Sequence, residues 1–160
     1  MRKLNFKKYL AMIALWFIGI GATIGASIYL ANHEGDEYDK YAIPYIQKAV
    51  AELSEWDPEK AKALMAEEVV AKIPEEKFSR AMSFFSQLGA LQSMEEPSFN
   101  KAFIDQQTDI GKQTIVEYDV NTHYEHGDAE INLKLLQKGS DYEIYSFNFR
   151  SEKLTPQEEK

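Results

Sequence analysis

The densest group of side chains that could do chemistry is the run His123-Tyr124-Glu125-His126, with two imidazoles and a carboxylate. A zinc-binding helix of the His-Glu-x-x-His type places its two histidines on one face, and the closer spacing here does not match it. The surrounding residues alternate as in a strand that runs into a turn, so His123 and His126 are expected to point in different directions. The run therefore predicts solvent-facing turn residues and no bound metal.

Acid–base catalysis would need an acid and a base held close together, and Tyr118, Asp119, Asp105 and Asp109 are the candidates. Tyr118 is expected to point into the core and Asp119 outward, because adjacent strand residues face opposite sides. Asp105 and Asp109 lie in an irregular stretch that fixes no direction for them. No spacing forces an acid and a base together, and no serine elbow, phosphate-binding glycine loop or dinucleotide fingerprint occurs. The sequence predicts no catalytic residues and no cofactor.

Alternating apolar and polar residues in the second half of the chain predict the strands that position these groups. Polar runs at Glu125–Asp128 and Lys138–Asp141 indicate the turns between the last three strands. Strong alternation predicts strands at Thr114–Tyr124, Ala129–Leu135 and Tyr142–Phe149, and weaker patterns suggest strands at Ala90–Glu96 and around Lys101–Asp105.

Apolar residues spaced three and four positions apart in the first half predict three helices. The first covers Ile43–Ser54, the second covers Pro58–Glu68, and the third begins at Pro74 and ends before Gly89. The inward faces of the third helix and of the longest strand are expected to form the core or to line a pocket within it. Those faces comprise Phe78, Met82, Phe85, Val116, Tyr118 and Val120.

Helices followed by antiparallel strands predict an α+β domain over residues 41–152, with about three helices on one face of a curved sheet of about four strands. The segments typical of one superfamily are Trp56-Asp57, Phe78–Leu88 running into Leu88-Gly89-Ala90-Leu91, Val116-Glu117-Tyr118, Tyr124–Ala129 and Tyr142–Phe147. Over Tyr41–Arg150 the chain resembles the cone-shaped superfamily of nuclear transport factor 2 and ketosteroid isomerase, in the form of short membrane-anchored bacterial envelope proteins. Enzymes of that superfamily place acidic, tyrosine or histidine groups inside the cone, where Tyr118 is expected here. The resemblance implies a fold and no particular activity, because such a fold carries many unrelated functions.

Residues 9–31 form an apolar run without a charge. As a helix the run would be roughly 34 Å long, enough to cross a hydrocarbon core of about 30 Å. Four cations within residues 1–8 precede it and several acids follow it, which predicts a cytoplasmic N-terminus and a domain on the far side of the membrane. The alternative is a secretory signal cleaved near Gly25-Ala26-Ser27.

Small residues on one side of this run give it a surface on which a second helix can approach closely. They are Gly21, Ala22, Gly25 and Ala26. The polar residues 32–40 predict a short tether that holds the domain close to the membrane, and residues 153–160 predict a polar tail.

The formal net charge of −8 is unevenly distributed along the chain. Residues 1–8 carry four positive charges, whereas residues 9–160 hold 14 Lys and Arg against 26 Asp and Glu, a net charge of −12. A domain this acidic is repelled by phosphate, which argues against nucleic acid as a partner. The absence of cysteine excludes disulfides and thiolate metal sites.

Together these features predict a single-pass protein of the bacterial inner membrane with a periplasmic domain. The leading hypothesis is a non-catalytic binding or assembly subunit of an envelope complex, whose partner is another envelope protein contacted in part through the membrane span. One alternative is capture of a small apolar or lipid-like ligand in the cone, and another is an unrecognised hydrolase or isomerase activity. A filled cone with an exposed aromatic patch would favour the binding or assembly subunit. A deep apolar pocket would favour ligand capture, and a deep pocket with an inward acid would favour an enzyme.

The predicted topology can be tested with single cysteines introduced into this cysteine-free chain. On intact spheroplasts, Ser151→Cys should react with an impermeant thiol reagent and Asn5→Cys should not, because only the C-terminal domain is expected outside the cytoplasm. Both positions should react after the membrane is permeabilised. The reverse labelling pattern would reject this topology.

Overall fold

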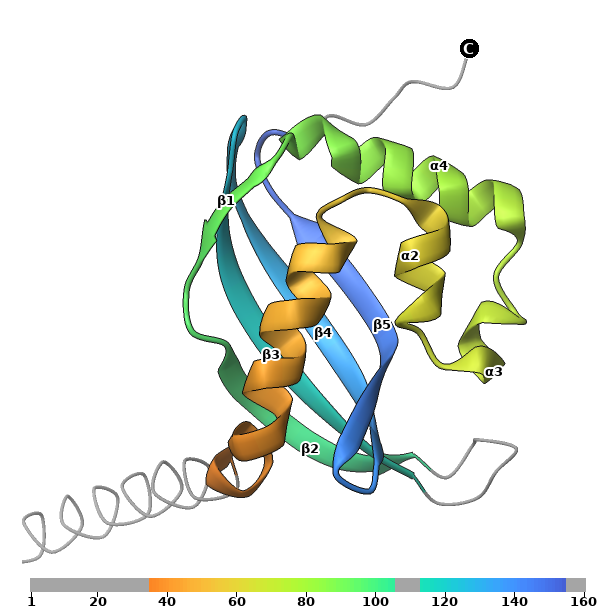
Figure 1. The fold of residues 1–160 in the computed structure, drawn as a ribbon, viewed down its shortest axis with the longest axis vertical. Helices are drawn as coiled ribbons and strands as arrows, with labels where there is room; N and C mark the ends of the chain where they lie inside the picture. The colour runs from red at the N-terminus through yellow and green to blue at the C-terminus, as the bar shows by residue number, and fades with distance from the viewer. Residues whose placement is uncertain (1–34, 106–112, 155–160) are drawn as a thin grey trace, which may run out of the picture. The chain divides into compact units, whose positions relative to one another are not determined.

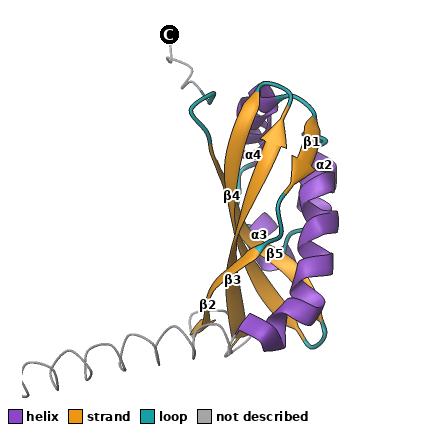
Figure 2. Cartoon of the chain, turned by 90° about the vertical axis from the view of Figure 1, so that its left-hand side faces the viewer, coloured by secondary structure: helices purple, strands orange, loops and turns teal. Residues whose placement is uncertain are grey.

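The computed structural model describes residues 35–105 and 113–154, which form an α+β domain (Figure 1). Residues 35–53 form a long helix that precedes the labelled elements. The remaining elements are α2 (Pro58–Ala63), α3 (Glu67–Val70), α4 (Glu75–Phe85), the 3₁₀ turn η1 (Ser86–Leu88), β1 (Leu91–Met94), β2 (Ser98–Asp105), β3 (Gln113–Tyr124), β4 (Gly127–Lys138) and β5 (Asp141–Arg150). Figure 2 shows the long first helix on one side of the sheet, and α2 and α4 contribute side chains to the core on that same side.

The described strands form one antiparallel sheet in the order β1-β3-β4-β5, in which β2 also pairs with β3. One edge of β3 pairs along its length with β4, and its other edge is shared by two shorter strands. β1 takes the end of β3 near Tyr124, and β2 takes the stretch from Asp119 to Gln113. The sheet therefore has five strands where the sequence pattern predicted about four.

The first helix begins earlier than the sequence predicted. Residues 35–40, interpreted as part of a polar tether, are helical and continuous with residues 41–53. Tyr38 stacks on Phe99 of β2, with ring centroids 5.9 Å apart. The Tyr118 hydroxyl donates a hydrogen bond of 2.7 Å to Asp39 Oδ1. These contacts dock the segment on β2 and β3, which its polar composition alone did not reveal.

The predicted second helix, Pro58–Glu68, is interrupted in the structure. It begins as expected, since Asp57 Oδ1 accepts a hydrogen bond of 2.8 Å from the Glu59 amide, but α2 ends at Ala63. The following residues pair with the edge of β5 instead, through Ala66 N–H to the Ile144 carbonyl and Ile144 N–H to the Leu64 carbonyl. The exposed edge of β5 thus supplies hydrogen bonds that compete with a continued helix.

The core lies between the helices and the face of the sheet that they cover, here called the inner face. Val116, Tyr118 and Val120 of β3 are fully buried there, opposite Met82 of α4. Phe78, also from α4, is buried as well, whereas Phe85 is only partly buried. The six predicted core or pocket residues therefore pack together. The Phe85 ring lies 4.8 Å from the ring of Phe149 on β5.

Partial burial lowers the stability loss expected for Phe85→Ala below the roughly 3–5 kcal/mol typical of a fully buried phenylalanine. We expect about 2 kcal/mol for Phe85→Ala and about 3 kcal/mol for Met82→Ala, whose side chain is 1% exposed. Both variants can be compared by urea unfolding of the detergent-solubilised chain. A loss below about 1 kcal/mol for Phe85→Ala would show that this ring does not pack on β5.

Candidate functional site

The face of the sheet opposite to the inner face, here called the outer face, carries polar rows that run across the strands. Strand alternation places Asp119, Asn121 and His123 of β3 on this face. Their cross-strand neighbours on β4 are Asn132, Glu130 and Asp128 respectively. Polar groups of β3 and β4 therefore stand side by side from His123 to Glu117. At the far end of the pair, Ile115 and Leu136 are buried against Ala66 in a small second apolar cluster.

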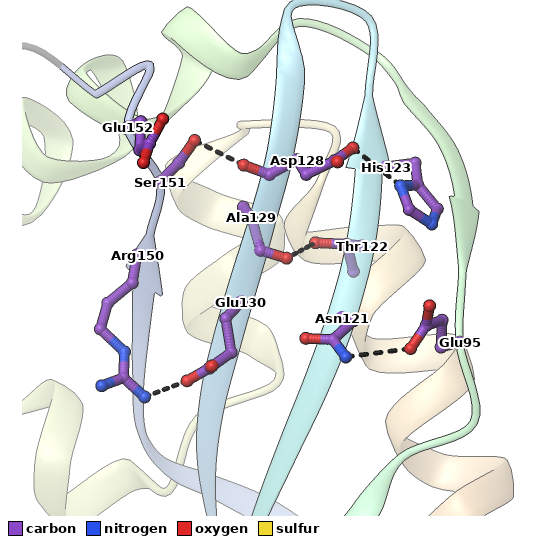
Figure 3. Close-up of a pocket in the computed structure, with 10 residues that line it drawn as sticks. All are labelled: Glu95, Asn121, Thr122, His123, Asp128, Ala129, Glu130, Arg150, Ser151 and Glu152. Atoms are coloured by element: carbon purple, nitrogen blue, oxygen red, sulfur yellow. Dashed lines mark hydrogen bonds and ion pairs between the residues drawn. The ribbon is translucent and has the colours of Figure 1, made fainter.

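A groove of about 380 Å³ hollows the outer face next to the β3–β4 turn (Figure 3). Its floor is the main chain of β3 and β4, where the Thr122 hydroxyl donates a hydrogen bond of 2.7 Å to the Ala129 carbonyl. Figure 3 shows Glu95 and His123 on one side and Arg150 and Glu152 on the other. The lining residues are Glu95, Asn121, Thr122, His123, Asp128, Ala129, Glu130, Arg150, Ser151 and Glu152.

Hydrogen bonds and ion pairs connect the walls of the groove to its floor. The Asn121 amide donates to Glu95 Oε2 at 2.9 Å, which ties the residue that follows β1 to β3. On the opposite wall, Arg150 forms an ion pair with Glu130. The Ser151 hydroxyl donates to the Asp128 main-chain carbonyl at 2.5 Å. The polar side chains therefore have fixed partners before any ligand arrives.

His123 and Asp128 form the polar pair nearest to the turn. The imidazole Nδ1 lies 2.7 Å from Asp128 Oδ1, and both side chains are exposed. The hydrogen bond that this carboxylate accepts from the imidazole, together with its negative charge, raises the pKa of His123 above the usual value. The Asp128 carboxylate therefore favours the protonated form of His123.

Glu117 departs from the exposure that the sequence pattern predicts for the outer face. The alternation of β3 predicts an exposed carboxylate, yet the residue is only 7% exposed. Lys101 and Lys134 are its direct neighbours on the adjoining strands, and Asn132 donates a hydrogen bond of 2.8 Å to it. Burial alone would raise the pKa of Glu117, but the bond from Asn132 and the nearby Lys101 lower it. The carboxylate is buried by neighbouring side chains and stays charged.

The two histidines of the run His123–His126 lie at separate places in the structure. His123 lines the groove, while the His126 ring nitrogen Nδ1 lies 2.9 Å from the Gln87 main-chain carbonyl in η1. Within the described residues, no group of three or more His, Asp or Glu side chains is arranged to hold a metal ion. The Ser151 hydroxyl donates to a main-chain carbonyl and is not paired with the imidazole of His123.

The remaining sequence-based candidates lie elsewhere. The six core residues named above pack on the inner face, opposite to the groove. Tyr118 reaches the end of the core, where burial and the hydrogen bond to Asp39 raise the pKa of its hydroxyl. Asp119 accepts a hydrogen bond of 2.8 Å from Asn132 on the outer face. Asp109 lies outside the described residues, and Asp105 ends β2.

Several groove residues were missed by sequence reasoning. Glu95 lies in the predicted strand Ala90–Glu96 but follows β1 in the structure, and Ser151 and Glu152 follow β5 beyond the last predicted strand. The sequence could have indicated part of the groove through the alternation of β3 and β4. Once the hairpin register is known, this alternation places Asn121 and Glu130 side by side on one face of the sheet.

The membrane-related predictions fall outside the part of the chain that the structure describes. These predictions are the span at residues 9–31 and its small-residue face, Gly21, Ala22, Gly25 and Ala26. Among the described residues, no helix has both the length and the apolar character needed to cross a membrane. No family model, curated protein or solved structure matches this chain.

The raised pKa of His123 gives a direct test of the groove geometry. Asp128→Asn should lower the pKa of His123, measured by NMR titration of the imidazole, because it removes the carboxylate that stabilises the imidazolium. By linkage, the pair stabilises the folded chain below the unfolded-state pKa, and this contribution is lost as the pH rises through the folded-state pKa.

The matched control is Glu95→Gln, which removes a more distant charge and should lower the pKa of His123 by less. A decrease in Asp128→Asn that is no larger than in this control would contradict the observed pairing.

Proposed function

We propose that this chain is a single-pass protein of the bacterial inner membrane whose periplasmic domain is a non-catalytic binding or assembly subunit of an envelope complex. The proposal takes the apolar run at residues 9–31 as an uncleaved anchor and the basic residues 1–8 as its cytoplasmic flank. It assigns the domain to the cone-shaped superfamily that its order of elements resembles. Another envelope protein is the proposed partner.

The observation that carries the proposal is the contrast between the two faces of the sheet. The inner face is occupied by close-packed side chains such as Tyr118, Leu133 and Leu135, all fully buried. The outer face instead presents ordered polar rows and a groove of about 380 Å³. A polar surface whose side chains are already fixed by one another loses little conformational entropy when it binds a partner. This favours recognition at the outer face over chemistry inside the fold.

The polar groups themselves support a binding role. Two of the polar contacts in the groove join lining residues to each other, Asn121 to Glu95 and Arg150 to Glu130. A nucleophile activated by a base would need a hydroxyl within reach of an imidazole. Here the hydroxyl of Ser151 is directed to a main-chain carbonyl.

A photo-crosslinking amino acid placed on each side of the domain tests which face meets the partner. Asn148 of β5 is exposed on the outer face beside Asn132, and Lys48 is exposed on the first helix. In the full-length protein in its native membranes, position 148 should give protein adducts under ultraviolet light and position 48 should give none.

Equal insertion and equal abundance of the two variants are the required controls. Adducts from position 48 alone would show that the partner binds the helical side of the domain and not the outer face. Their absence from both positions would contradict a role in a stable complex.

A further inference from the structure

The carboxylates of the groove are spread along its walls and do not converge on a point. Glu95 follows β1, Asp128 and Glu130 belong to β4, and Glu152 follows β5. Figure 3 shows them at separate places around the floor. A single metal ion needs several ligand atoms around one centre, and the described residues offer no such group. A ligand that matches this pattern carries several cationic groups at separate positions.

We infer that the groove binds a basic segment, bearing several Lys or Arg side chains, of the partner protein; this rests on the proposed function and names the chemistry of its partner. Four carboxylates line the groove against the guanidinium of Arg150 and the imidazole of His123. Arg150 is already neutralised by its ion pair with Glu130. The remaining excess of negative charge lies on the walls, where an incoming cation meets it.

The surroundings of the groove reinforce this choice of partner. Residues 9–160 carry a net charge of −12, so an acidic partner would be repelled and a basic one attracted at long range. The volume of about 380 Å³ lies in the range of roughly 300–1,000 Å³ typical of binding pockets. A floor made of the main chain of β3 and β4 leaves room for the long stems of Lys and Arg.

The experiment uses the full-length protein in nanodiscs of zwitterionic phosphatidylcholine, so that lipid charge does not contribute. The probe is a short fluorescent peptide of alternating lysine and threonine residues, followed by anisotropy. Binding is expected at low ionic strength and should weaken as salt is added toward about 0.15 M. An otherwise identical glutamate–threonine peptide should not bind.

Two pairs of substitutions separate the groove from the general charge of the domain. Glu95→Gln with Glu152→Gln removes two groove charges, and the new amide at 95 can still accept the hydrogen bond from Asn121. This double variant should weaken binding roughly fivefold, as expected for two exposed charges. The matched control, Glu37→Gln with Glu76→Gln, removes two exposed charges from the helical side and should change binding less than twofold.

Equal weakening by both pairs would overturn the inference, because it would show that the attraction belongs to the whole domain. Failure of the basic peptide to bind would overturn it as well. If spermidine binds as tightly as the peptide and is weakened equally by the groove variants, the inference is overturned, because the groove then recognises a small polycation and not a protein segment. If position 148 still gives adducts when the peptide fails, the proposed function stands and the partner has another chemistry.

Discussion

The register between β3 and β4 is the constraint on which the rest of the domain depends. Ten consecutive residues of β3, from Ile115 to Tyr124, are paired with β4 without a shift. Side chains alternate between faces along a strand, so a slip by one residue would move Tyr118 and its neighbours out of the core. The same slip would bring the polar rows inward, where their charges would lose water. One register thus sets both the core and the groove.

The end of this hairpin is held by contacts with segments distant in the sequence. The His126 N–H donates to the Leu88 carbonyl, and the Glu125 N–H donates to the Ala90 carbonyl. Trp56 reaches the same place, where its indole N–H donates to the Gly89 carbonyl at 2.8 Å. Gly89 has a φ of 80°, and a β-carbon there would lie 2.9 Å from the ring of His126. Glycine is therefore required where helix, turn and first strand meet.

Sequence reasoning located the elements whose own periodicity is strong. The alternation of Thr114–Tyr124 and the apolar face of α4 gave the long strands, the inner face and the α+β class. It failed where structure depends on contacts between distant segments. Residues 35–40 have the composition of a tether, and only the hydrogen bond between Asp39 and Tyr118 shows that they pack on the sheet. Similarly, α2 ends early because the residues after it form hydrogen bonds with the edge of β5. The groove was out of reach for the same reason, since its walls follow the ends of two strands that are far apart in sequence.

The division of one edge of β3 between two strands gives the groove walls of unequal firmness. The floor belongs to a hairpin with ten paired positions, whereas β1 is paired with β3 at only three, Leu91, Ser93 and Met94. Short paired segments open locally at a lower free-energy cost than the structure as a whole. The wall that bears Glu95, which is also held by the hydrogen bond from the Glu95 N–H to the Asn121 carbonyl, therefore opens at a lower free-energy cost than the floor. The two sides of the groove therefore differ in local stability, and the β1 side is the less stable one.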